Sequence, residues 1–170
     1  KFQHAGKRLS GLVFPLSALR TESSPGCGEF PDLAEAAEAA ASWGFELAQL
    51  LPVNDSGSEE SPYFALSAFA LNPIFIRIAD LHELRDEGAA TLLSEARGLV
   101  ARFGGSERVP YRQLRAAKME LLRKVWDFAG AAGARASGGR ASGTEAPDAW
   151  TEALDAWIEA NPWSKAYSAF

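Results

Sequence analysis

The chain is poor in the residues that build disulfides and metal sites. Its 170 residues include one cysteine, Cys27, and two histidines, His4 and His82. A single cysteine cannot form an internal disulfide, which favours a reducing compartment. Two histidines and one cysteine do not provide a zinc-ligand spacing. We therefore expect no metal and no cofactor, and we interpret Cys27 as an unreactive thiol in a loop.

Excess positive charge and long apolar runs are also missing. The chain has 17 Lys and Arg against 22 Asp and Glu, a net charge of −5. Nucleic-acid backbones bind clustered Lys and Arg, so this balance argues against such a partner, whereas a neutral carbohydrate would not be repelled. No apolar run approaches the ~20 residues of a membrane span, and residues 1–10 lack the apolar core of a signal peptide. The sequence predicts a cytoplasmic protein without a membrane partner.

What is present begins with a strand-helix-strand pattern. Residues 9–14 form a short apolar run that is typical of a buried strand. Asp32 and Glu35 predict a capping box at the start of an alanine-rich helix, which Gly44 ends. Residues 45–51 predict a second buried strand. This order is a βαβ unit, and it implies that the two strands are parallel.

A polar loop, residues 54–60, follows the second predicted strand. The carboxyl ends of parallel strands are where α/β proteins bind ligands, so this loop is a candidate binding region. Residues 74–78 alternate between apolar types and are β-branched, which predicts a third strand or an extended segment.

The second half of the chain is helical in pattern. One apolar stripe at helical spacing runs through residues 111–128. Residues 129–147 are rich in Ala, Gly and Ser, which predicts a flexible segment near 130–147. Residues 148–160 predict another helix, and Asn161-Pro162 predicts the cap and first position of the next one. The apolar stripe within residues 111–128 consists of Leu114, Ala117, Leu121, Val125 and Phe128.

Five blocks of sequence, in the same order, resemble the amylomaltase family of 4-alpha-glucanotransferases (glycoside hydrolase family 77). The blocks are residues 11–20, residues 26–30, the region 50–73 with Ser61-Pro62-Tyr63, Val109-Pro110-Tyr111 with Lys118, and Asn161-Pro162-Trp163 with Tyr167 and Phe170. A lone Ser-Pro-Tyr would carry no weight, but the ordered set is specific.

The resemblance implies a retaining (β/α)₈ enzyme that transfers α-1,4-glucan segments between maltooligosaccharides. Such chemistry needs two carboxylates that flank the scissile bond, and in the family they come from the second half of the barrel. A complete barrel takes ~250 residues, so we expect an N-terminal part of the enzyme. Residues 1–80 would form the first βα units of a partial TIM barrel, and residues 81–170 a mainly helical insertion. No catalytic residue is assigned, and this part alone should be inactive.

The resemblance does imply a substrate-binding residue. Tyr63 corresponds to the family tyrosine whose ring stacks on the sugar, and a pyranose offers an apolar C–H face for such stacking. Ser61, Asn54 and Asp55 lie on the same loop and could donate or accept hydrogen bonds. Taken alone, Tyr63 would be a loop-closing tyrosine, and Asp55 is equally consistent with a simple turn.

Other polar and aromatic residues favour structural interpretations. Phe64 stands where the family has a small or polar residue, and Arg115 lies where some relatives have a tyrosine of a secondary glucan site, so no such site is expected. The tryptophans Trp126, Trp150, Trp157 and Trp163 are spaced as core or helix-packing residues rather than as a carbohydrate platform. The basic residues Arg112, Arg115, Lys118, Arg123 and Lys124 predict a solvated helix face.

The alternative function is a stand-alone carbohydrate-binding or interaction domain without catalysis. In either case, part of a barrel leaves strand edges unpaired, and unpaired edges promote association. We expect either self-association of the chain or coverage of the sheet by the helices of the insertion.

Overall fold

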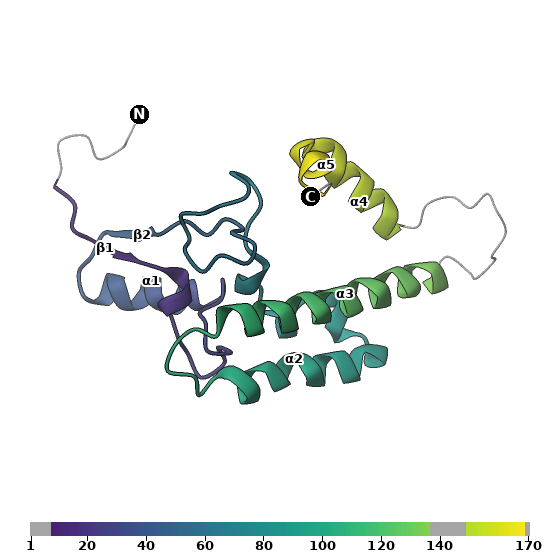
Figure 1. The fold of residues 1–170 in the computed structure, drawn as a ribbon, viewed down its shortest axis with the longest axis horizontal. Coiled ribbons are helices and arrows are strands. Elements are labelled where there is room, and N and C mark those ends of the chain that lie inside the picture. Colours follow the sequence, from purple (N-terminus) through teal and green to yellow (C-terminus); the bar gives the residue numbers. More distant parts are fainter. Residues whose placement is uncertain (1–7, 137–148, 169–170) are drawn as a thin grey trace.

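The computed structural model describes residues 8–136 and 149–168. Strands β1 (Gly11–Phe14) and β2 (Leu47–Leu50) pair in parallel, and helix α1 (Asp32–Ser42) lies between them in the chain (Figure 1). The register sets Gly11 opposite Leu47 and Phe14 opposite Leu50. The predicted parallel βαβ unit is confirmed, in a mixed α/β chain with a two-stranded sheet.

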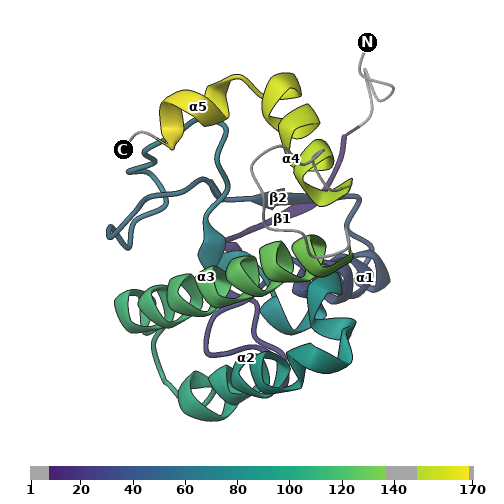
Figure 2. The same ribbon diagram turned by 90° about the vertical axis from the view of Figure 1, so that its right-hand side faces the viewer.

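Helices α2 (Ala90–Phe103) and α3 (Tyr111–Ala136) lie side by side and form the body of the molecule (Figures 1 and 2). The predicted apolar stripe is confirmed, because Leu114, Leu121 and Val125 are buried. Since α3 continues to Ala136, the first part of the predicted flexible segment is helical instead. Residues 137–148 lie outside the described residues.

Two further helices follow, α4 (Ala149–Ala160) and α5 (Trp163–Tyr167). The predicted positions of Asn161 and Pro162 are both wrong, because Pro162 is the N-cap of α5 and the helix begins at Trp163. The amide oxygen of Asn161 accepts from the indole Nε1 of Trp163 at 3.3 Å. Among the helices that the structure describes, none is long and apolar enough to cross a membrane.

The segment predicted as a third strand or an extended segment contains two 3₁₀ turns, joined by the extended residues Ile76 and Arg77. The first is η2 (Pro73–Phe75) and the second is η3 (Ile78–Asp80); η4 (His82–Arg85) and η5 (Glu87–Ala89) lead into α2. The strand prediction was wrong because Asn72 accepts a hydrogen bond from Ile74 N and starts a turn, for which the following proline is preorganised.

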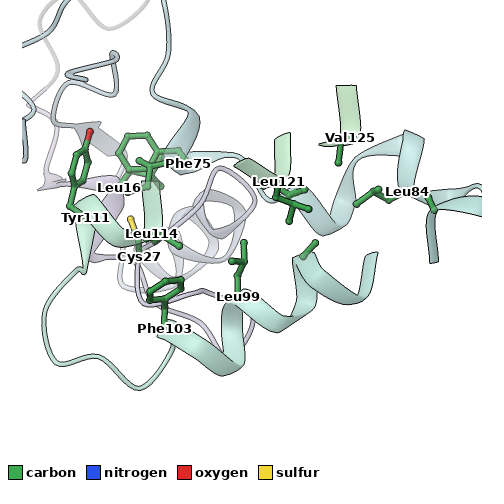
Figure 3. Packing of buried hydrophobic residues seen from close by; sticks show 14 residues of the cluster. Leu16, Cys27, Phe75, Leu84, Leu99, Phe103, Tyr111, Leu114, Leu121 and Val125 are labelled. Atoms are coloured by element: carbon green, nitrogen blue, oxygen red, sulfur yellow. The ribbon is translucent and has the colours of Figure 1, made fainter. Parts of the chain in front are cut away.

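The hydrophobic core lies around α2 and α3 and not on the sheet. Leu16 and Cys27 pack with Leu114 of α3, and α2 contributes Leu99 and Phe103 (Figure 3). No residue of β1 or β2 belongs to this buried cluster. The prediction that both strands are buried is therefore wrong for the described structure.

The ends of α1 show one wrong prediction and one confirmed prediction. Asp32 is the first helical residue, preceded by Pro31, and it does not cap the helix; its buried carboxylate accepts hydrogen bonds from the surrounding loop instead. At the other end Gly44 has φ +84°, the left-handed conformation that ends helices and that glycine adopts without steric cost.

Candidate functional site

A cavity of about 450 Å³ opens at the carboxyl ends of both strands. Pro15 and Ser17, which follow β1, line one side, and Pro52 and Asn54, which follow β2, line another. Its volume lies in the range of small-molecule sites. Its place at the carboxyl edge of parallel strands is the place where α/β proteins bind ligands.

Three of the four predicted binding residues lie together at this cavity. Tyr63, Ser61 and Asn54 all line it. The Tyr63 ring is 69% exposed, so one face is available to a ligand. The Tyr63 N–H lies 3.4 Å from Ser61 Oγ, which bends the chain just before the ring.

Asp55 does not line the cavity. It is buried, and its carboxylate accepts from Gly57 N at 2.9 Å, as in a simple Asx turn. The same carboxylate pairs with Arg115 on α3 and accepts from the hydroxyl of Tyr167 on α5. Asp55 therefore anchors the loop, and its predicted contact with a ligand stays without structural support.

The electrostatics of this anchor favour an ionised aspartate and a protonated tyrosine. Burial raises the pKa of Asp55, but the Tyr167 hydroxyl, the Gly57 N–H and Arg115 together hold that pKa below its usual range. Burial and the hydrogen bond to Asp55 raise the pKa of Tyr167 to about 12. The Tyr167–Asp55 contact is therefore a charge-assisted hydrogen bond, the stronger kind.

The wall of the cavity contains a polar network that the sequence reasoning missed. Tyr111 Oη accepts from Asn72 Nδ2 at 2.8 Å and donates to the carbonyl of Gly57 at 3.0 Å. Ser56 Oγ lies 3.1 Å from the same phenol oxygen and donates to the carbonyl of Glu59 at 2.7 Å. All three side chains line the cavity. Asn72 and Tyr111 lie inside the blocks that resemble the family, which was the available signal.

Away from the lining of the cavity, Glu29, Asp32, Arg77 and Lys118 form a largely buried ion cluster. Lys118 is 1% exposed, and its ammonium donates to Glu29 and to the carbonyls of Ile74 and Ile76, the last two at 2.6 and 2.9 Å. Arg77 Nε donates to Glu29 at 2.8 Å, and Arg77 also pairs with Asp32. The cluster ties the loop before α1 to α3.

The burial of Lys118 corrects the predicted solvated helix face. Lys118 is four residues after Leu114 and three before Leu121, so it projects from the same face as the apolar stripe. Burial lowers the pKa of Lys118, and the nearby Glu29 carboxylate opposes this change only in part. The outer basic residues Arg112 and Lys124 do lie in solvent, as predicted.

Two tryptophans also differ from their predicted burial. Trp126 is 52% and Trp157 is 48% exposed, so neither is a core residue. Trp157 does pack edge-on against Trp163, with ring centroids 5.8 Å apart, which supports its role in helix packing. The side chain of Trp150 lies outside the described residues.

The thiol of Cys27 is fully buried, and its Sγ lies 3.5 Å from the carbonyl of Gly28. Burial raises the pKa of Cys27 to about 12. The thiolate is the reactive form, so this thiol is inert, as predicted from the sequence.

The described residues that line the cavity do not include the pair of carboxylates that a retaining mechanism needs. Glu60 is the one carboxylate among its lining residues, and it is largely exposed beside Arg112, at 3.8 Å. Retaining glycoside chemistry needs two carboxyl groups ~5 Å apart. Within residues 8–136 and 149–168, no group of three or more His, Cys, Asp or Glu side chains could hold a metal ion.

Comparisons with known proteins show to which family the chain belongs. The sequence profile of the 4-alpha-glucanotransferase family matches residues 14–170. A 4-alpha-glucanotransferase of Chlamydia caviae is 35% identical over 118 residues, which cover 69% of this chain and 22% of the relative. One of Chlamydia trachomatis is 35% identical over 117 residues, covering 68% and 21%. One of Oryza sativa subsp. japonica is 31% identical over 124 residues, covering 70% and 13%.

The chain thus spans less than a quarter of the length of these curated relatives. The profile match nevertheless extends from the end of β1 through α5, across every element that lines or supports the cavity. The chain belongs to the 4-alpha-glucanotransferase family, glycoside hydrolase family 77.

Proposed function

We propose that this chain supplies the first βα units of a (β/α)₈ barrel, and that its cavity binds part of an α-1,4-glucan in a cytoplasmic 4-alpha-glucanotransferase. The observation that carries the proposal is the exposed Tyr63 ring at the rim of a cavity at the carboxyl edge of two parallel strands. Ligands bind at that edge in barrels, and family membership supports a glucan as the ligand.

The residues of this chain bind and orient the glucan rather than break its bonds. Tyr63 stacks on the apolar face of one glucose unit, while Asn54 and Ser61 hydrogen-bond to its hydroxyls. Asp55 acts indirectly, by holding the loop. The nucleophile and the general acid of the retaining mechanism lie elsewhere in the full-length protein, so this chain alone carries out no transfer.

Replacement of Tyr63 by alanine in the full-length protein tests this proposal. Loss of the stacked ring should lower kcat/KM for transfer between maltooligosaccharides by about 10- to 100-fold, since an aromatic contact contributes a few kcal/mol where it is well packed. Tyr63→Phe keeps the ring and should retain most of the activity.

The matched control is Phe64→Ala. Phe64 is the next residue, is equally exposed at 66%, and does not line the cavity. Its removal should leave transfer unchanged. Equal rates for Tyr63→Ala and the wild type, or equal losses for both alanine variants, would refute a specific stacking role.

The open sheet supports a second proposal, self-association of the isolated chain. Val13 on β1 is 62% exposed and Leu47 on β2 is 50% exposed, and exposed apolar edges promote pairing. The alternative expectation, that helices of the insertion cover the sheet, is wrong for the described residues. Sedimentation velocity should show dimers or larger species, and a monomer at all concentrations would refute the proposal.

A further inference from the structure

Helix α5 contacts both ends of the loop of residues 55–70, which carries Tyr63. At the start of the loop, the Tyr167 hydroxyl donates to Asp55. At its end, Phe69 stacks on Trp163, with ring centroids 5.9 Å apart and an interplanar angle of 20°. Figure 2 shows α5 lying against this loop. The helix therefore spans the base of the loop, while Tyr63 lies between the two contacts.

Asp55 is the residue on which the loop closes. Its N–H donates to the carbonyl of Ala70 at 2.9 Å, and its own carbonyl accepts from Leu66 N at 2.7 Å. Its carboxylate accepts from Gly57 N, and Gly57 has the positive φ of +59° that makes this tight turn possible. A shift of Asp55 would therefore move the chain segments that precede and follow Tyr63.

Arg115 alone holds the Asp55 carboxylate loosely. One terminal nitrogen of the guanidinium is shared between both carboxylate oxygens, at 3.2 Å each. The Nε of Arg115 is buried and has no hydrogen-bond partner within residues 8–136 and 149–168. The pair lacks the two parallel hydrogen bonds of a strong arginine–carboxylate contact. The Tyr167 hydroxyl therefore adds to the hold that the Gly57 N–H and Arg115 have on the Asp55 carboxylate, and it is the one contact that comes from α5.

We propose that Tyr167 is a positioning residue for the glucan site: its hydroxyl holds Asp55, and Asp55 holds the loop that sets the Tyr63 ring at the rim of the cavity. The role of Tyr167 in glucan binding rests on the proposed function of Tyr63. The structural part of the proposal, that the contact of α5 with Asp55 restrains the loop, does not depend on any ligand.

The test compares Tyr167→Phe with Lys165→Ala in the full-length protein. Tyr167→Phe removes only the hydroxyl and keeps the ring, which packs against Trp163 with centroids 6.4 Å apart. Lys165 is an exposed residue of the same short helix, so its change controls for effects on α5 itself. Hydrogen exchange and glucan kinetics are measured for both variants.

Tyr167→Phe should accelerate exchange of the Asp55, Gly57 and Leu66 amides about tenfold, as expected for loss of a hydrogen bond to a charged group. Amides of α2 should be unaffected, which separates local loosening from general destabilisation. KM for maltoheptaose should rise several-fold with little change in kcat, since the chemistry lies elsewhere. Lys165→Ala should change neither readout.

A second variant separates the hydrogen bond from other effects. In Asp55→Asn the tyrosine keeps an acceptor but loses the charge that strengthens the bond, so the loop amides should exchange at an intermediate rate. Combined with Tyr167→Phe its effect should be less than additive, because both changes weaken the Tyr167–Asp55 contact, although Asp55→Asn also removes the ion pair with Arg115.

The outcomes distinguish this proposal from the proposed function. Unchanged exchange of the loop amides in Tyr167→Phe, or equal acceleration in α2, would overturn the hold of α5 on the loop. Faster loop exchange with an unchanged KM, while Tyr63→Ala raises KM, would overturn the positioning role alone. If Tyr63→Ala leaves transfer intact, the proposed function fails, and the exchange data still decide whether α5 holds the loop.

Discussion

The helical body and the two-stranded sheet differ sharply in how they bury apolar side chains. Leu114 of α3 is fully buried, whereas Leu47 of β2 is 50% exposed, although both are leucines in regular elements. The core cluster draws on α2, α3, the turns between residues 72 and 89, and Leu16 and Cys27 from the segment between β1 and α1, but on no strand. The helical body therefore contains most of the core, whereas the sheet leaves Val13 and Leu47 exposed and buries Leu12, Phe14 and Leu50 only in part.

The same contrast separates buried charge from the candidate binding site. The ion cluster around Lys118 lies inside the helical body, where every ionised group has a partner. The cavity at the end of the sheet is open and carries an exposed aromatic ring. The buried charges are paired within the fold, and the surface of the cavity is open to a ligand. Three sets of substitutions in the chain can sharpen or break this contrast.

The largest effect should come from Lys118→Met. Methionine keeps much of the side-chain volume but leaves Glu29 buried without its ammonium partner. Breaking a buried ion pair on one side costs about 3–5 kcal/mol of the free energy of unfolding. Urea denaturation measures this loss of stability. The control is Lys124→Met, because Lys124 is an exposed lysine of the same helix and its replacement should barely change the free energy of unfolding. A small effect at Lys118 would mean that the cluster is not buried in solution.

A matched pair of leucine substitutions comes next. Leu114→Ala leaves a cavity in the core and should lower the free energy of unfolding by about 2–5 kcal/mol. Leu47→Ala removes an exposed side chain and should change it by less than about 0.5 kcal/mol. Equal losses in urea denaturation would show that the sheet is covered after all, for instance by a second copy of the chain.

The smallest effect, and the one that depends on pH, should come from Asp32→Asn. Burial raises the pKa of Asp32, but hydrogen bonds from Glu29 N, Ser24, Arg77 and Thr21 outweigh it and hold the pKa below the usual range. A carboxyl with a lowered folded-state pKa stabilises the fold above its unfolded pKa of about 4, and loses this as pH falls through the folded pKa.

The substitution should therefore cost about 1–3 kcal/mol near pH 7, and the difference from wild type should shrink as the pH falls below about 4. Unfolding measured at several pH values checks it. A difference that stays constant down to pH 2 would assign the loss to packing rather than to charge.

Short-range sequence patterns correctly predicted the features that depend on residues close together in the chain. The strand-helix-strand unit, the glycine that ends α1 and the apolar stripe on α3 all follow from spacing within a few turns of chain. Predictions that depended on distant neighbours were less successful. Residues 74–78 alternate like a strand, but their apolar side chains are buried against α2 and α3 from short 3₁₀ turns.

The candidate site was predictable in part, for the same reason. Tyr63, Ser61 and Asn54 follow a strand end and match a family block, so their common place at the cavity was foreseeable. The anchoring of Asp55 by Arg115 and Tyr167 was not, because these partners are 60 and 112 residues away in the chain. Pairings at that distance leave no periodic trace in a single sequence.

The sequence by itself determined the parallel βαβ unit, the apolar face of α3 and membership in a glucanotransferase family, because helix and strand periods and motif order are local properties of the chain. Only the tertiary structure decided that Lys118 is buried, that Asp32 and Asp55 are anchors, and that the strands stay exposed. Burial and ion pairing depend on which segments meet in space, and the free energy of a charged side chain changes by several kcal/mol between water and a packed interior.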